Sequence, residues 1–215
     1  MIEAVIFDMD GVLVDSERLH HDVDTQIYHH FGITVPESER SLFVGLSVQK
    51  VYSIICSKYP VPRDFGFLVE FDRRYRAVVF SRAPLQVPDG LKDFLEKLKK
   101  LGIKAGVASG SSLELIDVVL KKLHLEEYFT VRVSSEAVER SKPFPDVFLR
   151  TASLLATEPE NCMVIEDSGY GLTAARAAGM TGVGYFNPGS GIQDFTMADH
   201  VIHSFKDPVI ETILS

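Results

Sequence analysis

Two patterns of hydrophobic and polar positions cover most of the chain. From residue 91 onward, segments with apolar residues three or four positions apart alternate with short runs of strand-forming residues, and a similar run stands at residues 4–7. The patterns predict helices at 91–101, 113–123, 146–155, 172–178 and 208–214, and strands at 4–7, 104–108, 131–134, 162–165, 182–186 and 201–202. Strands that alternate with helices are typical of a parallel sheet wrapped by helices. We therefore expect a Rossmann-like α/β core.

One block interrupts this alternation directly after the first strand. It predicts helices at 17–31, 48–58 and 65–80, separated by prolines, and no convincing strand. The block is nearly neutral, whereas the rest of the chain carries almost all of the net charge of −8. We therefore expect a smaller all-helical cap domain at residues 16–83, inserted into a core domain made of residues 1–15 and 84–215.

Composition narrows the class of protein. With 215 residues, of which 46% are hydrophobic and 24% charged, the chain is long enough for one core and a smaller module. The acidic balance argues against a nucleic-acid partner, and no apolar run reaches the roughly 18 residues that span a bilayer. Cys56 and Cys162 form no disulfide framework, which fits a reducing compartment. We expect a cytoplasmic protein without a nucleic-acid or membrane partner, and a monomer by default.

Two acids end the first predicted strand. Asp8 and Asp10 follow its apolar residues, and Gly11 allows the backbone to turn beside them. If the strand holds to Asp10, the two carboxylates share one side of it, and close carboxylates need a cation or a shared proton. A plain turn is the alternative. A calcium loop is excluded because its last ligand would fall on Leu19 and a strand precedes the acids where a helix should be.

Three other strand ends carry polar groups, and ligands of parallel sheets bind at that edge. After the second strand, Ser109 and Gly110 offer a hydroxyl and an N–H to a phosphate, although helix capping by Ser111 or Ser112 is an equally good interpretation. After the third, two prolines hold the backbone around Lys142 and would place its ammonium rigidly.

The fourth strand end repeats the acidic pattern of the first, with Glu166 and Asp167. Together with Asp8 and Asp10 they offer hard oxygen ligands with few nitrogens or sulfurs, a set that favours Mg²⁺. The seven histidines do not cluster as a zinc set, and His29 and His30 are expected on a solvated helix face.

Four short motifs occur here in the order and spacing known from the haloacid dehalogenase superfamily: residues 8–16, the turn at Ser109, Lys142-Pro143 and Glu166-Asp167-Ser168. The chain resembles this superfamily over essentially its whole length. It is similar to the branch with a small helical cap, which contains β-phosphoglucomutase and many sugar-phosphate phosphatases. The resemblance implies five main parallel strands, the first motif on the central strand, and a mobile cap.

The resemblance also implies catalytic roles. Asp8 would be the nucleophile that takes the phosphoryl group as an aspartyl phosphate, and Asp10 would protonate the leaving alcohol and then deprotonate the attacking water. Ser109, the Gly110 N–H and Lys142 would bind the phosphoryl oxygens, and Lys142 would keep Asp8 ionised. The presence of Asp10 implies phosphatase chemistry rather than dehalogenation, because an alkoxide leaving group needs a proton.

Metal and substrate contacts follow from the same resemblance. Mg²⁺ would be held by Asp8, the Asp10 carbonyl and Asp167, with Glu166 bound directly or through water. We also expect substrate contacts from Gly11, next to these acids.

Cap residues are expected to choose the substrate. His20 falls where the β-phosphoglucomutase-like members have a cap histidine near the acid/base, although a polar helix face is an equally good interpretation. Gly45 and Ser47 belong to a stretch that resembles the specificity loop of these members. The mutases carry an arginine right after that serine, to bind a second phosphate, and Val48 occupies this position here. That departure favours a phosphatase.

A second cap feature is a group of three arginines in one predicted helix, Arg73, Arg74 and Arg76. They could bind a distal anion, although such a group is more typical of a solvated face.

These expectations add up to a Mg²⁺-dependent phosphatase that hydrolyses a small phosphomonoester, a sugar phosphate, through an aspartyl phosphate. A phosphosugar mutase is the alternative. A phosphate-binding regulatory protein without turnover is a weaker third possibility, because pure binding does not require an acid/base at Asp10.

Overall fold

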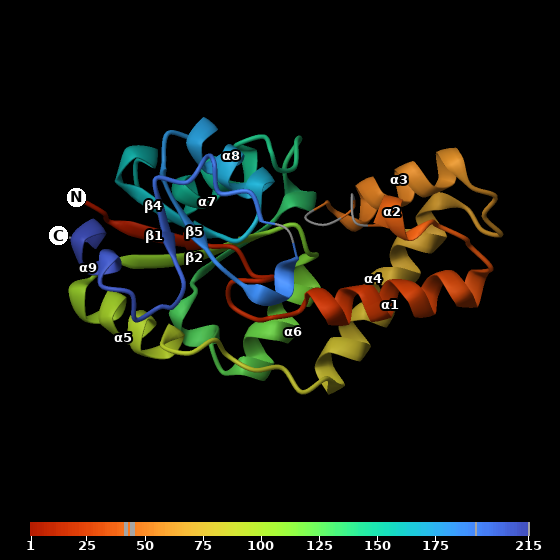
Figure 1. The fold of residues 1–215 in the computed structure, drawn as a ribbon, viewed down its shortest axis with the longest axis horizontal. Helices are drawn as coiled ribbons and strands as arrows, with labels where there is room; N and C mark the ends of the chain where they lie inside the picture. The colour runs from red at the N-terminus through yellow and green to blue at the C-terminus, as the bar shows by residue number, and fades with distance from the viewer. Residues whose placement is uncertain (41–42, 44–45, 192, 215) are drawn as a thin grey trace.

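The computed structural model describes residues 1–40, 43, 46–191 and 193–214. Its centre is a sheet of six parallel strands in the order β3-β2-β1-β4-β5-β6 (Figure 1). The strands are β1 (Ala4–Phe7), β2 (Lys104–Ser109), β3 (Val131–Ser134), β4 (Cys162–Glu166), β5 (Thr181–Tyr185) and β6 (His200–Ile202). β1 pairs with β2 on one side and β4 on the other, so the first motif follows a central strand.

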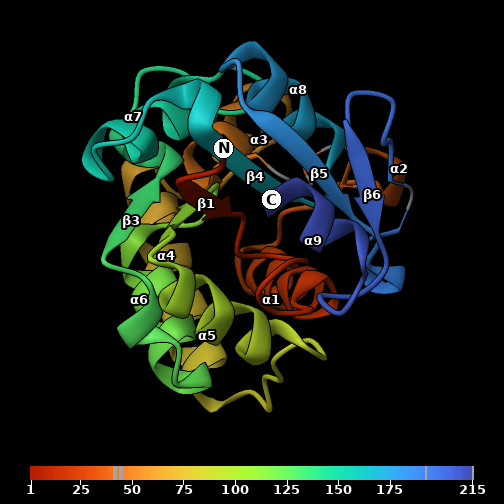
Figure 2. The same ribbon diagram turned by 90° about the vertical axis from the view of Figure 1, so that its left-hand side faces the viewer.

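Helices cover both faces of the sheet (Figure 2). They are α5 (Leu91–Leu101), α6 (Leu113–Leu123), α7 (Asp146–Leu154), α8 (Gly169–Ala177) and α9 (Val209–Leu214). Alternate residues of β1 serve the two faces: Val5 and Phe7 pack into one apolar cluster with α5, α6 and α9, whereas Ala4 and Ile6 pack into a second with α7 and α8. All four side chains are fully buried, which is why this strand reads as an unbroken apolar run. The expected Rossmann-like α/β core is confirmed.

The block between β1 and α5 is helical in its described part. It contains α1 (Glu17–Phe31), α2 (Glu37–Arg40), α3 (Val48–Lys58) and α4 (Phe65–Arg82), which lie to one side of the sheet (Figure 1). These helices have an apolar cluster of their own, built around Tyr28, Tyr52, Ile55 and Leu68. We call residues 16–83 the cap, and the exact domain boundaries stay a prediction.

Local signals place most helix ends within a few residues of the expected positions. The Ser112 side chain accepts from the Leu115 N–H and starts α6, so capping by Ser112 is confirmed. Ser168 caps α8 in the same way through the Gly171 N–H, and the helix therefore begins earlier than the apolar pattern suggested. Short 3-10 turns complete the connections: Glu126–Tyr128, Ser135–Ala137, Pro159–Asn161 and Pro188–Ser190. In the described ranges no helix is both long and apolar enough to cross a membrane.

Candidate active site

The chain turns directly after β1, and this turn carries the first two acids. Asp8 follows the strand, and its N–H donates to the Ile165 carbonyl of β4 at 2.9 Å. The backbone then folds back, with the Leu13 N–H donating to the Met9 carbonyl at 2.9 Å. The strand therefore does not hold to Asp10, and the expectation that strand alternation aligns the two acids is wrong. The turn itself brings both carboxylates to one pocket.

Asp8 shares a buried cation with Glu166. Lys142 Nζ donates to Asp8 Oδ1 at 2.5 Å, to Glu166 Oε1 at 2.6 Å and to the Ala108 carbonyl at 3.1 Å. The same ammonium lies 4.9 Å from the centroid of the Phe148 ring. Burial lowers the pKa of Lys142, but the two carboxylates outweigh burial and raise it overall. Lys142 therefore remains charged.

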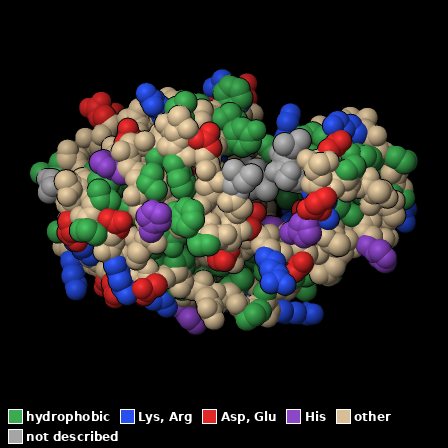
Figure 3. Space-filling view, viewed as in Figure 1, with side chains coloured by type: hydrophobic (Ala, Val, Ile, Leu, Met, Phe, Trp, Pro, Cys, Tyr) green, Lys and Arg blue, Asp and Glu red, His purple; other side chains and the backbone are tan. Residues whose placement is uncertain are grey.

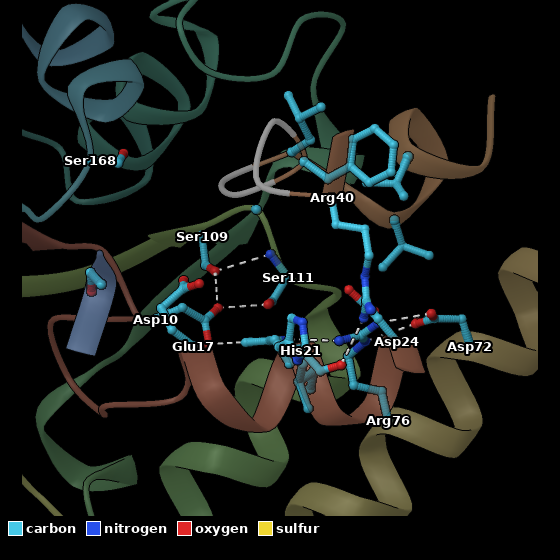
Figure 4. A pocket seen from close by; sticks show the side chains of 18 of the residues that line it. Asp10, Glu17, His21, Asp24, Arg40, Asp72, Arg76, Ser109, Ser111 and Ser168 are labelled. Carbon is cyan, nitrogen blue, oxygen red and sulfur yellow. Dashed lines mark hydrogen bonds and ion pairs between the residues drawn. The ribbon is translucent and has the colours of Figure 1, made fainter. Parts of the chain in front are cut away.

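Asp10 accepts hydrogen bonds from four side chains, two at the start of α1 and two in the turn after β2. Ser16 Oγ and His20 Nε2 lie 2.6 and 2.7 Å from Asp10 Oδ1. Ser111 Oγ and Ser109 Oγ lie 2.8 and 3.4 Å from Oδ2 (Figure 4). Burial raises the pKa of Asp10, but His20 and the hydroxyls of Ser16 and Ser111 more than offset it and hold the pKa below its usual range. The ligand-free site therefore holds Asp10 as a carboxylate.

His20 is fixed from its other side by Arg76. Arg76 Nη1 lies 2.8 Å from His20 Nδ1, and the guanidinium also pairs with Asp72 at 2.8 Å and Asp24 at 2.6 Å. Burial and Arg76 lower the pKa of His20, but Asp10 outweighs them and raises it overall. A guanidinium has only donors, so the contact with Arg76 is a hydrogen bond only in the neutral ring, where Nδ1 accepts. In that form, as in the protonated one, Nε2 carries a proton that it donates to Asp10.

The turn after β2 faces the same acids. Ser109 is 1% exposed, and its Oγ accepts from the Ser111 N–H at 3.0 Å and lies 3.4 Å from Asp10 Oδ2. Ser109 and Gly110 both line the pocket. Phosphate binding by this turn stays a prediction.

Asp167 lies against Gly11, in a position that requires glycine. A Cβ on Gly11 would stand 1.9 Å from Asp167 Oδ2, and Gly11 has a φ of +82°. Burial and the neighbouring Glu166 raise the pKa of Asp167 well above its usual value. Burial likewise raises the pKa of Asp8, although Lys142 opposes this. The carboxylates of the pocket therefore outnumber Lys142, which carries the one buried ammonium among the described residues. A bound cation would offset the excess negative charge.

The donor set fits Mg²⁺. In the part of the chain that the structure describes, no group of three His, Cys, Asp or Glu side chains forms a ready metal cage. Mg²⁺ does not need one, since it keeps several waters and binds through one or two carboxylates plus substrate phosphate. Glu166 directs Oε1 to Lys142 and accepts from the Ser168 N–H on Oε2 at 2.9 Å. A cation contact from Glu166 thus stays a prediction.

A cavity of about 410 Å³ joins these groups to the cap. Its core side is formed by the acids, Lys142 and the Ser109 turn; its cap side includes Tyr28, Leu46, Val48 and Tyr52. On the face shown in Figure 3, charged and histidine side chains gather where the cap meets the core. A small molecule bound here would touch both parts.

Only some of the residues that were expected to contact the substrate line the pocket. The His20 side chain is 20% exposed and contacts Asp10, so the solvated-face interpretation is wrong; contact with substrate stays a prediction. Ser47 caps α3 through the Lys50 N–H and is not among the described lining residues. Gly45 lies outside the described residues. Gly11 accommodates Asp167 and likewise does not line the pocket.

The arginines of α4 also differ from a solvated face. Arg76 is buried, Arg73 forms an ion pair with Glu136 of the core at 2.8 Å, and only Arg74 is well exposed. The ion pair of Arg76 was not predicted, although the four-residue spacing of Asp72 and Arg76 on one helix is a usable signal for it. The contacts of Ser16 and Ser111 with Asp10 carried no such signal, because they depend on how α1 and the Ser109 turn meet.

Fold and site together define a class: an α/β protein with a parallel sheet, whose acidic pocket lies between the carboxyl ends of its strands and an inserted helical cap. The family model described as haloacid dehalogenase-like hydrolase matches residues 5–185, and the chain belongs to this family.

Similar proteins include phosphatases and a mutase. Hexitol phosphatase B of Escherichia coli K12 is 31% identical over 185 residues, covering 85% of this chain and 82% of that protein. β-Phosphoglucomutase of Bacillus subtilis is 28% identical over 218 residues, covering 99% and 94%. The crystal structure of β-phosphoglucomutase from Clostridium difficile superposes with a TM-score of 0.84 at 27% identity, covering 100% of this chain and 96% of that one.

Proposed function

We propose that the protein is a Mg²⁺-dependent phosphatase that hydrolyses a small sugar phosphate through an aspartyl-phosphate intermediate. The observation that carries the proposal is the arrangement of Asp8 and Asp10 in one pocket. Asp8 is held by a buried ammonium, and Asp10 is held separately by hydroxyls and an imidazole. Two carboxylates with such different surroundings are suited to different tasks.

Asp8 is the nucleophile in this proposal. One of its oxygens forms a bond to phosphorus while the bond from phosphorus to the leaving oxygen breaks. Lys142, 2.5 Å from Asp8 Oδ1, favours the charged carboxylate against the burial that raises the pKa of Asp8, and it would bind a phosphoryl oxygen. Ser109 and the Gly110 N–H bind further oxygens of the same group.

Asp10 moves the protons. It gives a proton to the leaving oxygen in the first step, and the carboxylate then takes a proton from water as water attacks the phosphoenzyme. The second step releases inorganic phosphate and regenerates Asp8. Since the ligand-free site favours Asp10 as a carboxylate, Asp10 must gain a proton before the first step.

Asp8, Asp167 and the Asp10 carbonyl would hold Mg²⁺, with Glu166 as a direct or water-mediated contact. Bound there, the ion would offset negative charge on the transferring phosphoryl group.

The cap side of the cavity favours a substrate with one phosphate over a mutase intermediate with two. Val48 lines the cavity, and three of the four described lining arginines, Arg40, Arg73 and Arg76, are each paired with an acid. The fourth, Arg18, forms no ion pair among the described residues. At these three arginines a second phosphate would have to compete with those acids, whereas at Arg18 it would not. The 28% sequence identity with β-phosphoglucomutase of Bacillus subtilis keeps a phosphosugar mutase as the second candidate function.

Phosphate release from a panel of phosphomonoesters tests the proposal. The panel contains hexose 6-phosphates, hexitol phosphates and β-glucose 1-phosphate, with Mg²⁺ or with EDTA. We expect Mg²⁺-dependent release that Asp8→Asn abolishes and that Asp117→Asn, an exposed acid paired with Arg132, leaves intact. Conversion of β-glucose 1-phosphate to glucose 6-phosphate with little phosphate released would establish the mutase instead.

A further inference from the structure

The segment after β5 reaches back to the candidate active site, although no motif was recognised in it. It begins at Asn187, continues through the turn Pro188–Ser190 and ends, in its described part, at Gln193. In Figure 1 this turn is the short blue helix next to the first residues of α1, with which it is in contact. The segment is therefore placed at the junction of core, cap and acidic pocket.

Two amide side chains of this segment connect the backbones of the first and fourth motifs. Asn187 Nδ2 donates to the Gly11 carbonyl at 3.2 Å, and Gln193 Nε2 donates to the Asp167 carbonyl at 2.9 Å. The two residues are also linked to each other, because the backbone N–H of Asn187 donates to Gln193 Oε1 at 3.1 Å. Gln193 is held further by the Tyr185 carbonyl at 3.2 Å. We call Asn187 and Gln193 the amide clamp.

The clamped backbones are those that present the oxygens expected to bind the cation. Gly11 is one peptide unit beyond the Asp10 carbonyl, and the Asp167 carbonyl belongs to the residue whose carboxylate lies against Gly11. A shift of either backbone would change the spacing of these oxygens. Mg²⁺ tolerates little change because it demands near-octahedral geometry at short distances.

Ser190 adds a second observation at the same place. Its Oγ is buried and makes no hydrogen bond of good geometry among the described residues, although it is close enough to Asp167 to lower the pKa of that carboxyl as a donor. Ser190 Oγ and Asp167 Oδ2 lie 2.9 and 1.9 Å from one point, the position that a Cβ on Gly11 would take. A buried hydroxyl without a partner beside a carboxylate has a donor to offer to Asp167 or to a water on the cation.

We infer that Asn187 and Gln193 are positioning residues for the divalent-cation site, and that Ser190 supplies a further donor beside Asp167. The inference rests on the proposed function in one respect, that a divalent cation binds at these acids. Neither clamp amide carries a charge, so the clamp acts through geometry and leaves the charge of the site unchanged. Loss of such supporting contacts typically weakens metal binding by about 10- to 100-fold.

Mn²⁺ titration followed by electron paramagnetic resonance tests the inference without relying on turnover. We would compare the wild type with Asn187→Leu, Gln193→Met and Ser190→Ala. The matched controls are Asn161→Leu and Gln26→Met, whose amides contact Glu3 and Tyr75 away from the site. We expect the dissociation constant of Mn²⁺ to rise about 10-fold or more in both clamp variants and by a smaller factor in Ser190→Ala, while the controls match the wild type.

Unchanged Mn²⁺ affinity in folded clamp variants would overturn the inference and leave the proposed function standing. Absence of Mn²⁺ binding by the wild type would instead contradict the cation on which both depend. Circular dichroism reports whether each variant is folded. If the clamp variants do not fold, Ser190→Ala decides, because it removes one hydroxyl without a partner and should not disturb folding; wild-type affinity in this variant then counts against the inference.

Discussion

At the scale of single residues, the charge balance of the site depends on Lys142. Its ammonium contacts two carboxylates whose side chains are at most 9% exposed. Replacing it by methionine leaves both acids without a cation in a buried setting. We therefore expect Lys142→Met to lower the free energy of unfolding by about 3–5 kcal/mol, measured by urea denaturation.

Lys206→Met is the control for this prediction. Lys206 pairs with Asp89 at 2.8 Å, but both side chains are more than half exposed, and we expect only a small effect. A similar loss of stability in both variants would contradict the special position of Lys142. Adding Glu166→Gln to Lys142→Met should recover part of the stability without restoring phosphate release, because Asp8 would still lack its cation.

Gly11 gives a second prediction at the residue scale. Alanine at this position would adopt an unfavourable φ of +82° and would place its Cβ 1.9 Å from Asp167 Oδ2. Gly102 has a similar φ of +71° with nothing within 4 Å of a Cβ, so Gly102→Ala reports the backbone strain alone. We expect both variants to lose stability by about 1 kcal/mol or more, and only Gly11→Ala to lose Mn²⁺ affinity. Equal Mn²⁺ binding by the two variants would contradict this account.

The role of Asp10 can be separated into its two steps. A p-nitrophenolate leaving group needs no proton, so Asp10→Asn should still form the phosphoenzyme from p-nitrophenyl phosphate. The second step should slow by about 10²- to 10⁴-fold, because no base activates the water. Stopped-flow absorbance should then show a burst of about one p-nitrophenolate per enzyme. If the burst is missing while Asp10→Asn still turns over at the wild-type rate, Asp10 is not the base.

At the scale of elements, α4 is joined to the core by one bidentate ion pair. Arg73 Nε and Nη2 lie 3.1 and 2.8 Å from the two oxygens of Glu136. Both groups are partly exposed, at 25% and 14%, so solvent screens the pair. A double-mutant cycle with Arg73→Ala and Glu136→Ala should give a coupling of about 0.5–1 kcal/mol in unfolding at low salt.

Repeating the double-mutant cycle at high salt tests whether this coupling is electrostatic. At 1 M NaCl the coupling should shrink, because the screening length falls to about 3 Å. The pair Arg132–Asp117, at 2.7 Å within the core, is the matched comparison for an ion pair that does not join cap and core. If the Arg73 and Glu136 effects simply add, the contact contributes nothing to holding α4.

Elements were predictable from the sequence where one local signal decides. β1 is buried on both faces and reads as an apolar run; α6 begins at a serine cap; α1 ends at Gly32, which has a φ of +63°. Backbone turns were less predictable. The chain leaves β1 before Asp10 because hydrogen bonds close a turn there, and no residue pattern distinguishes that turn from one more extended residue.

The candidate active site likewise combines residues that could be predicted from the sequence with residues that could not. Asp8, Glu166 and Asp167 stand at strand ends, and a parallel sheet brings those ends to one edge. Lys142 lies in the connection between β3 and α7 and reaches the same edge. The environment of Arg76 could not be predicted, because its burial depends on Asp24 of another helix. The same holds for the amide clamp, whose partners lie 176 and 26 residues away in sequence.

At the scale of the whole molecule, the cavity draws its lining from both the cap and the core, so a ligand bound there should stabilise them together. Vanadate with Mg²⁺ is a suitable probe, since vanadate resembles phosphate and can bind at Asp8. At about 100 times its dissociation constant, a ligand adds about 2.7 kcal/mol to the free energy of unfolding. For a chain of this size we expect Tm to rise by about 5–10 °C.

Two controls decide whether the expected rise in Tm comes from the acidic pocket. Asp8→Asn removes the carboxylate at which vanadate would bind and should abolish most of the shift, whereas Asp117→Asn should keep it. Mg²⁺ alone should give a smaller shift than Mg²⁺ with vanadate, because the ion contacts only the core acids. A full shift in Asp8→Asn would place the anion elsewhere on the molecule and would contradict the proposed site.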